Sequence, residues 1–292
     1  MVSQVRRFNR VVTQRVGALD DRFLARGRPL GEARLLWELG EGERDIRSLR
    51  AQLGHDSGYM SRLLHSLETA GMISVGPNPT DHRVRTARLT AAGQVERAVL
   101  DERSDDLAAS LLTPLSLRQR QRLVASMAVV ERLMTAGAVV MEPVDPADPR
   151  AQYCLRSYVD ELNTRFDSGF EPSRSIPAGV DDLRPPAGLF VLATLYGNPV
   201  GCGALKFHPA TPAELKRMWV SASARGLGIG RRMLDELEMR ALDGGARVVR
   251  LETNGTLVEA IRLYRSAGYT EVPAFNDEPY AHHWFEKRLS RD

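Results

Sequence analysis

The stretch RGLGIG, from Arg225 to Gly230, has the residue types of an anion-binding loop. Three glycines alternate behind an arginine, and the helical pattern RRMLDELEMRAL follows at once. A glycine turn that opens a helix leaves unpaired N–H groups at the positive end of the helix dipole, where phosphate groups bind. The same sequence also suits a tight connection between a strand and a helix that binds nothing. The loop by itself leaves both interpretations open.

Two common nucleotide-binding motifs do not fit this loop. The dinucleotide fingerprint G-x-G-x-x-G, counted from Gly226, requires a third glycine where the chain has Arg231. The P-loop ends in G-K-[ST], whereas Gly230 is followed by two arginines. The sequence therefore predicts a strand, a glycine turn and a helix N-terminus that belong to neither motif.

The elements that position the loop lie in the second half of the chain. A strand pattern at 138–143 runs into a Pro/Asp-rich break, which places a domain boundary between residues 136 and 137. A long loop without periodicity, residues 167–188, follows a predicted helix, and loops of that length in compact domains are mostly functional or mobile. We expect strands at 189–197, 199–208, 214–220, 247–254, 269–272 and 282–289, and helices at 150–166, after the glycine loop to 242, and at 256–268, the last opened by a capping box formed by Thr256 and Glu259.

The glycine loop and its neighbours together resemble a known family. Arg225-x-x-Gly228-x-Gly230 matches the signature [RQ]-x-x-G-x-[GA], and LYRSAGY follows on a later helix. With the order of strands and helices, residues 138–290 resemble the GCN5-related N-acetyltransferases (GNAT), which implies an α/β domain with a mixed sheet over residues 137–292 and acetyl-CoA as cofactor. In many members an asparagine lies three residues before the helix alanine, whereas Asn254 lies six before Ala260. The resemblance implies that the cofactor is bound by Met218, Val220, Arg225, Gly226, Leu227, Gly228, Ile229, Gly230, Asn254 and Tyr264.

Acetyl transfer to an amine requires a neutral amine, a polarised thioester carbonyl and a proton for the leaving thiolate. The resemblance implies that Tyr264 supplies the proton and that a main-chain N–H near Val220 polarises the carbonyl, although Tyr264 also suits a packed helix aromatic. Glu214 is our candidate base and Glu252 its rival, while each also fits a salt-bridged strand residue. Two adjacent histidines without further ligands predict no metal site. Candidates for acceptor binding are Glu252, Asn276, Tyr280, His282 and His283.

The first half of the chain is mostly helical up to about residue 136, with two short strands in residues 72–90. SLETAGMISV followed by DHRVRTARLTAAG resembles the MarR family of regulators. This implies a mostly-α winged helix-turn-helix domain over residues 1–136 that dimerises through its first and last helices and binds double-stranded DNA at a palindrome. Leu63, Leu64 and Leu67 are expected to pack inward. The residues expected to reach DNA are Ser57, Tyr59, Ser61, Arg62 and His65 on the second helix of the motif and Arg83 and Arg85 on the wing.

Charge is distributed unevenly between the two halves. Residues 1–140 contain 21 Lys+Arg and 16 Asp+Glu, a net +5, whereas residues 141–292 contain 19 and 21, a net −2. The first half therefore suits a polyanion better than the second. The two cysteines, Cys154 and Cys202, fit buried thiols rather than a disulfide framework. No stretch approaches the roughly 18 apolar residues of a membrane span, and no apolar segment follows the basic start, so we expect a cytoplasmic protein.

These observations predict a homodimer that combines a DNA-binding regulator with an acetyl-CoA-dependent N-acetyltransferase. The acceptor is a primary amine, either of a small molecule or of a protein lysine. Two alternatives remain: a regulator whose GNAT domain only senses acyl-CoA, and an enzyme whose N-terminal domain serves only dimerisation.

Overall fold

The computed structural model describes residues 1–17, 24, 27–40, 42–78, 82, 84–208 and 212–290. The chain divides into two compact units, Met1–Val129 and Val130–Asp292. In the part of the chain that is described, no helix is long and apolar enough to cross a membrane.

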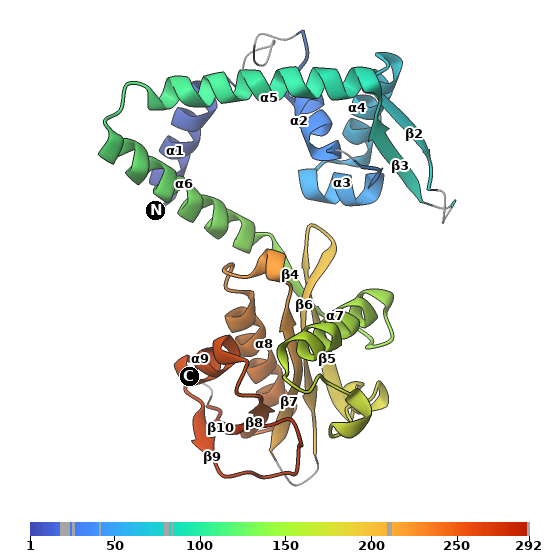
Figure 1. The fold of residues 1–292 in the computed structure, drawn as a ribbon, viewed down its shortest axis with the longest axis vertical. Coiled ribbons are helices and arrows are strands. Elements are labelled where there is room, and N and C mark those ends of the chain that lie inside the picture. Colours follow the sequence, from blue (N-terminus) through green and yellow to red (C-terminus); the bar gives the residue numbers. More distant parts are fainter. Residues whose placement is uncertain are drawn as a thin grey trace. The chain divides into compact units, whose positions relative to one another are not determined.

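The first unit combines helices with a small antiparallel sheet (Figure 1). Its sheet has the strand order β1-β3-β2. A helix, a turn, a second helix and a two-stranded wing follow one another, as the MarR-like pattern predicts. The helices are α1 Val2–Arg15, α2 Leu30–Leu39, α3 Ile46–Leu53, α4 Ser57–Thr69, α5 Ala91–Leu112 and the start of α6 Leu117–Gly137, and the strands are β1 Arg44–Asp45, β2 Ile73–Pro77 and β3 Arg85–Leu89.

Capping residues fix the two helices of the helix-turn-helix motif. The Asp45 carboxylate accepts a hydrogen bond from the Ser48 N–H at the start of α3, and Asp56 accepts one from the Tyr59 N–H at the start of α4. Gly54 ends α3 in the left-handed conformation, with φ of +65°. Leu63, Leu64 and Leu67 of α4 are buried in one core with α2, as their spacing predicts. Strand β1 was not predicted, because two residues are too few to show an alternating pattern.

Two helices bury no side chain within the chain. Neither α1 nor α6 has a buried residue. Exposed apolar side chains follow both helices, among them Phe8 at 44% and Val12 at 39% on α1, and Val124 at 52% and Met127 at 51% on α6. Exposed apolar patches are a common feature of protein interaction sites.

The second unit is built on a seven-stranded mixed sheet with the strand order β4-β5-β6-β7-β8-β10-β9. All neighbouring strands are antiparallel except β7 and β8, which are parallel. The strands are β4 Val139–Pro143, β5 Gly188–Leu195, β6 Asn198–Lys206, β7 Ala213–Val220, β8 Val248–Thr253, β9 Thr270–Val272 and β10 His283–Arg288, and the helices are α7 Pro149–Arg165, α8 Ile229–Asp243 and α9 Val258–Ser266.

Helices cover both faces of this sheet. Along β5, Val191 packs in the core that contains α8 and α9, whereas Phe190 and Leu192 pack in the core that contains Cys154 of α7. Successive residues of a strand point to opposite faces of the sheet. Both faces of β5 are buried, and its sequence is therefore a continuous apolar run. Both cysteines are buried free thiols, as predicted.

The predicted capping box at the start of α9 is wrong. The α9 N-cap is Leu257, which makes no side-chain capping bond. The Thr256 hydroxyl and N–H instead donate to Oδ1 of Asn254, at 2.9 Å each. Glu259 pairs with Arg165 of α7 at 2.7 Å. Both groups of the expected box therefore have partners elsewhere.

Candidate functional site

A cleft opens in the sheet where β7 and β8 separate. The two strands pair only at Ala213 with Val249 and Glu214 with Arg250, although β7 continues to Val220 and β8 to Thr253. The β6–β7 register shifts between Cys202 and Ala204, and opposite this shift Arg217 has a φ of +56°. A bulge of this kind bends a strand and re-aims its side chains. The edges of β7 and β8 that face each other are therefore free beyond Glu214.

The larger cavity of this unit, about 550 Å³, extends from the glycine loop to α9. Of the predicted cofactor residues, Leu227 does not line it, and Asn254 lines a neighbouring cavity instead. The residues predicted to bind the cofactor that do line it are Met218, Val220, Arg225, Gly226, Gly228, Ile229, Gly230 and Tyr264.

The glycine loop has the geometry of an anion site. Gly226 and Gly228 have φ of +81° and +75°, which L-residues rarely adopt. Gly228 is the N-cap of α8, which has no side-chain cap and no acidic residue in its first turn. The first N–H groups of α8 therefore remain available to a ligand at the positive end of the helix dipole.

Arg225 is held by a carboxylate of α7. Its Nη2 lies 2.6 and 2.5 Å from the two oxygens of Glu161, which also accepts hydrogen bonds from Trp219 Nε1 and Arg165. Burial raises the pKa of Glu161, but Arg225 and the other donors outweigh it and lower that pKa below its usual value. Glu161 was missed because nothing in the sequence of α7 indicates that this face meets a loop some 60 residues later.

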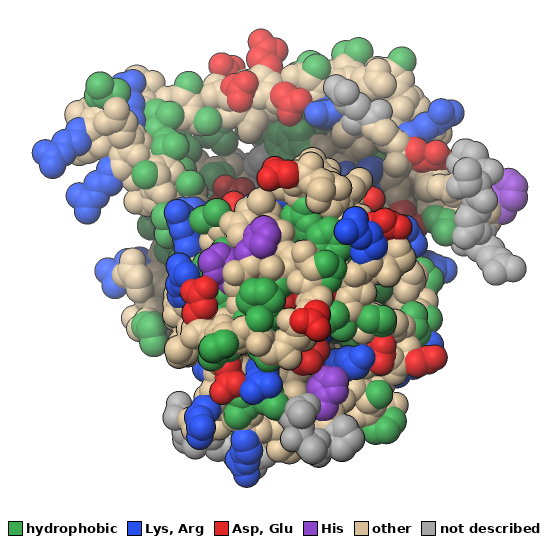
Figure 2. Space-filling model, turned by 60° about the horizontal axis from the view of Figure 1, so that its bottom comes forward, with side chains coloured by type: hydrophobic (Ala, Val, Ile, Leu, Met, Phe, Trp, Pro, Cys, Tyr) green, Lys and Arg blue, Asp and Glu red, His purple; other side chains and the backbone are tan. Residues whose placement is uncertain are grey.

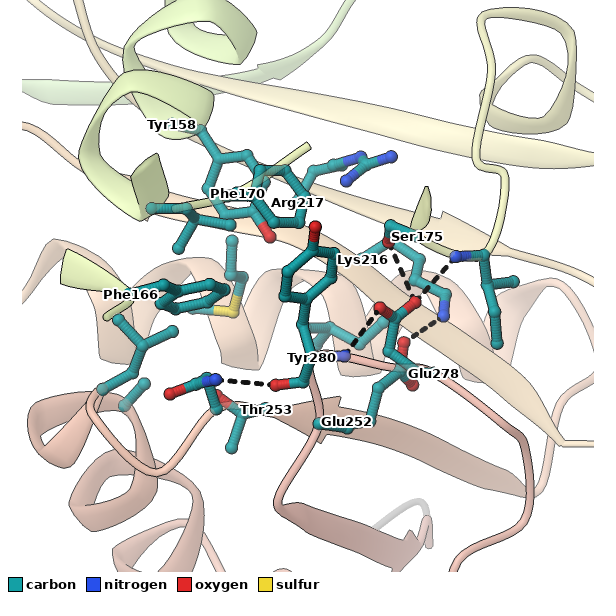
Figure 3. A pocket seen from close by; sticks show the side chains of 18 of the residues that line it. Tyr158, Phe166, Phe170, Ser175, Lys216, Arg217, Glu252, Thr253, Glu278 and Tyr280 are labelled. Carbon is teal, nitrogen blue, oxygen red and sulfur yellow. Dashed lines mark hydrogen bonds and ion pairs between the residues drawn. The ribbon is translucent and has the colours of Figure 1, made fainter. Parts of the chain in front are cut away.

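A smaller cavity of about 100 Å³ adjoins the cleft (Figure 3). Tyr158, Met218 and Tyr264 line both cavities. Aromatic rings of Phe166, Phe170 and Tyr280 form part of its wall. Four charged side chains also line it: Lys216, Arg217, Glu252 and Glu278.

Tyr264 lies at the junction of the two cavities. Its side chain is buried, and no hydrogen-bond partner for its hydroxyl is found among the described residues. Burial, with the nearby Tyr158 and Glu252, raises the pKa of Tyr264 well above its usual value. The hydroxyl therefore keeps its proton at neutral pH.

The two candidate bases flank Lys216 in different ways. The Lys216 Nζ lies 3.1 Å from Glu214 Oε2 and also pairs with Glu252 Oε1. Burial lowers the pKa of Lys216, but the two carboxylates outweigh it and raise that pKa. Glu252 lines the smaller cavity, and its Oε2 has no hydrogen-bond partner in the described part of the chain. Glu214 lines neither cavity.

The segment before β10 contributes Tyr280 and an unpredicted acid, Glu278, to the smaller cavity. Glu278 accepts hydrogen bonds from Ser175 Oγ at 2.9 Å and from the Ile176 N–H at 2.7 Å. It thereby fixes the long loop that precedes β5. Asn254 also supports this segment, through a 2.7 Å bond from Nδ2 to the Tyr280 carbonyl.

Three residues predicted to bind the acceptor line neither cavity: Asn276, His282 and His283. Asn276 accepts a hydrogen bond from Trp284 Nε1, His282 Nδ1 accepts one from the Gly255 N–H, and His283 lies 2.6 Å from Glu271. These side chains support the backbone around β10. No group of three or more metal-ligating side chains is found among the described residues.

In the first unit, most of the predicted DNA-reading residues are exposed. Tyr59 is the exception on α4: it is half-buried against the core, with its hydroxyl where a side chain on Gly31 would lie. Arg85 is exposed on β3, and Arg83 lies outside the described residues. The exposed positions of α4 are Ser57, Ser61, Arg62 and His65.

The second unit does not show a surface of one charge on the face seen in Figure 2. Basic and acidic side chains are interspersed there. This distribution agrees with the nearly balanced charge of residues 141–292. The excess of basic residues lies in the first half of the chain.

Residues 155–269 match the model of the acetyltransferase (GNAT) family, and residues 26–84 match the model of the MarR family. An IAA acetyltransferase of Azospirillum brasilense is 37% identical over 123 residues, which cover 42% of this chain and 79% of that protein. An uncharacterized N-acetyltransferase of Schizosaccharomyces pombe is 33% identical over 100 residues, 34% of this chain and 58% of that protein.

Solved structures are also similar to the second unit. An acetyltransferase of the GNAT family from Staphylococcus aureus is 18% identical, with a TM-score of 0.45. The similarity covers 52% of this chain and 100% of that protein's chain. An aminoglycoside 6'-N-acetyltransferase complexed with coenzyme A, also 18% identical, covers 52% of this chain and 99% of its own, with a TM-score of 0.39. The chain thus joins an N-terminal region that matches the MarR family model to a C-terminal region that belongs to the acetyltransferase (GNAT) family.

Proposed function

We propose that the second unit transfers an acetyl group from acetyl-CoA to a primary amine, and that the first unit binds double-stranded DNA as a homodimer in the cytoplasm. The observation that carries the enzymatic part is the position of Tyr264. Its unpartnered hydroxyl lies where the large cleft that begins at the glycine loop meets a small charged cavity.

Separate features of the larger cavity suit the separate parts of coenzyme A. The N–H groups at the start of α8 and the glycine loop would hold the diphosphate, because they are uncapped and electropositive. The free edge of β7 near Met218 and Val220 offers backbone groups to the pantetheine amides, as an added strand would. Acetyl-CoA supplies the activated acyl carbon when it is bound.

The residues where the two cavities meet have different roles in the reaction. The amine enters from the smaller cavity as an ammonium and gives one proton to the base. Its nitrogen then forms a bond to the acyl carbon as the carbon–sulfur bond breaks. Tyr264, which is protonated at neutral pH, gives its proton to the departing sulfur and regains one from the second N–H of the amine. A main-chain N–H of β7 near Val220 stabilises the oxyanion.

We assign the base to Glu252 rather than Glu214. Glu252 lines the cavity that the amine occupies and has an oxygen without a partner in the described part of the chain. Glu214 does not line that cavity and pairs with Lys216. Lys216 pairs with both carboxylates and offsets their charge.

The DNA-binding part rests on the first unit. Ser61, Arg62 and His65 form an exposed row on α4, whose opposite face is buried. The apolar faces of α1 and α6, which bury nothing within one chain, suit the interface of a homodimer. A two-fold dimer presents two such helices to a palindrome.

The test is release of the coenzyme A thiol from acetyl-CoA in the presence of a library of primary amines. We expect thiol release only with acceptor present and a matching loss of free amine. Acetyl-CoA binding without turnover on any amine or lysine peptide would favour the alternative of a regulator that senses acyl-CoA. Turnover without affinity for DNA would favour an enzyme whose first unit serves dimerisation alone.

A further inference from the structure

Arg217 and Glu278 are the two charged residues of the smaller cavity that the reaction above does not use. Arg217 lies at the bulge of β7 with a φ of +56°, a conformation that L-residues rarely adopt. Its carbonyl accepts a hydrogen bond from the Cys202 thiol at 3.2 Å. Its guanidinium carbon lies 5.8 Å from the centre of the Tyr158 ring. The bulge and its two supports hold the side chain at the cavity.

The other charges of this cavity are held by opposite charges or hydrogen bonds, whereas the Arg217 guanidinium lies against the neutral Tyr158 and meets no carboxylate among the described residues. Lys216 is balanced by two carboxylates, and Glu278 is bound by donors from Ser175 and Ile176. No carboxylate pairs with the Arg217 guanidinium among the residues that the structure describes. A half-buried guanidinium at the wall of a cavity is stabilised when an anion occupies that cavity.

Arg217 and the two acids of the cavity lie on different sides of it, and Lys216 lies with the acids. In Figure 3, Arg217 lies with Tyr158 on one side, and Glu252 and Glu278 lie on the other, with Tyr280 between. The acids are buried: Glu278 is 8% exposed, and the Glu252 side chain is 9% exposed. A molecule with an amine at one end and a carboxylate at the other matches both sides.

We propose that the acceptor is a small amino acid, that is, a primary amine that also bears a carboxylate, and that Arg217 binds this carboxylate. Glu252 and Glu278 receive the amine, which places its nitrogen toward Tyr264. The rings of Phe166, Phe170 and Tyr280 surround the apolar part of the molecule. This inference rests on the proposed acetyl transfer and narrows its substrate class.

Arg217 does not belong to the coenzyme site. It lines only the smaller cavity, whereas Met218, the next residue, lines both. Arg225 and the uncapped N–H groups of α8 lie at the other end of the cleft. A role for Arg217 in holding the coenzyme diphosphate therefore does not fit its position.

The test compares matched acceptors in the full-length protein with acetyl-CoA. Each series contains an amino acid, its carboxamide, and the amine that lacks both the carboxylate and the carboxamide. One series is phenylalanine, phenylalaninamide and phenethylamine. Corresponding series are built on leucine and on 4-aminobutyrate. The carboxamide has the more easily deprotonated amine, so a preference for the acid does not arise from amine basicity. We expect wild-type kcat/KM to favour the acid in at least one series by roughly 10-fold or more.

Arg217→Gln should reduce that preference by roughly 10- to 100-fold, chiefly through KM for the acid. Arg217→Lys, which keeps the charge but loses the bidentate geometry, should restore part of it. Arg156→Gln is the matched control, because Arg156 is exposed on α7 and lines neither cavity. A wild-type preference for the carboxamide or the simple amine in every series would overturn the proposal, as would an unchanged preference in Arg217→Gln.

A binding measurement separates this inference from the proposed reaction. Calorimetry with the coenzyme A-saturated protein should show that phenylalanine, leucine or 4-aminobutyrate binds wild type more tightly than Arg217→Gln. If no amine is acetylated but this difference is present, the proposed reaction fails and the carboxylate site stands. Turnover of simple amines without binding of any of the three acids would leave the reaction intact and refute the carboxylate site.

Discussion

Arg225 of the glycine loop and Glu161 of α7 form an ion pair at the wall of the cleft. A single nitrogen of the arginine, Nη2, lies within 2.6 Å of both carboxylate oxygens. The arginine that begins the signature of the loop is thus engaged with the protein itself. Any anion that binds the loop competes with Glu161 for this guanidinium.

Glu161→Gln should therefore tighten coenzyme A binding. The change removes a negative charge from the wall of a cleft that receives a polyanion, and we expect roughly 3- to 10-fold lower Kd, typical of a partly exposed charge. Asp160→Asn is the control, since Asp160 is an exposed neighbour that lines neither cavity. Weaker binding in Glu161→Gln, measured by calorimetry, would mean that the ion pair organises the site instead.

This ion pair also has a defined pH dependence. The pKa of Glu161 is lowered in the folded chain from its ordinary value of 4.5. Its contribution to stability is therefore complete above that ordinary value and is lost as the pH falls through the lowered one. The gain in affinity of Glu161→Gln over wild type should consequently persist across neutral pH and diminish only in acid.

Gly228→Glu should abolish acetyl-CoA binding, because it puts a carboxylate at the N-terminus of α8, where the diphosphate is expected. Part of the effect comes from the backbone, since φ at this position is +75°. Gly228→Ala measures that part alone, because a Cβ here meets no atom within 4 Å. We expect the alanine variant to retain most of its affinity in calorimetry. Equal affinities of the glutamate variant and wild type would remove the loop from the cofactor site.

Tyr264→Phe should lower kcat by roughly 10²-fold or more with little change in the affinity for acetyl-CoA, as expected for the loss of a general acid. Tyr269→Phe is the matched control, because its ring lies 5.9 Å from that of Tyr264 but lines neither cavity. Since the pKa of Tyr264 is raised, deprotonation of this residue should not limit kcat anywhere between pH 6 and the ordinary tyrosine pKa of about 10. A wild-type rate in Tyr264→Phe would reduce this residue to a packing role.

Arg85→Ala should weaken binding to a palindromic operator with half-sites about 10 base pairs apart, and lower the slope of log K against log salt by about one unit if the guanidinium meets a phosphate. Arg88→Ala offers a comparison on the same strand. Because Arg85 and Arg88 are an odd number of residues apart, Arg88 lies on the opposite face of β3. There its Nε donates a hydrogen bond to Ser74 Oγ. Identical salt slopes for Arg85→Ala and wild type would exclude the phosphate contact.

Phe8→Asp should dissociate the homodimer, because the substitution places a charge within the apolar face of α1. The same acid at Gln14, an exposed polar position on another face of α1, should leave the dimer intact. Sedimentation velocity over a range of concentrations distinguishes the two states. A monomeric wild type, or a dimeric Phe8→Asp, would place the interface elsewhere.

The features that were predicted correctly depend on local patterns. The glycine loop, the helix after it and the succession of strands and helices along the chain follow from glycine spacing, helical periodicity and alternation, which act over a few residues. The inward packing of Leu63, Leu64 and Leu67 follows from the same periodicity.

The features that were missed depend on contacts between distant segments. Arg217 reaches the cavity because β7 bulges against β6, and no pattern within β7 reveals that register shift. Glu278 lies in an irregular segment and takes its role from the 167–188 loop. The capping box failed for a similar reason, since Arg165 on α7 attracts Glu259 away from the start of α9.

The burial of Cys154 and Cys202 determines how this protein behaves toward thiol reagents. Both sulfur atoms are enclosed, and each is engaged with a main-chain carbonyl, Gly201 for Cys154 and Arg217 for Cys202. Buried thiols of this kind react slowly while the fold is intact. A chromogenic disulfide added to the native protein in the proposed assay would therefore report coenzyme A release against a low background. In denaturant the same reagent would titrate two equivalents per chain, so that one colorimetric measurement follows both turnover and the opening of the second unit.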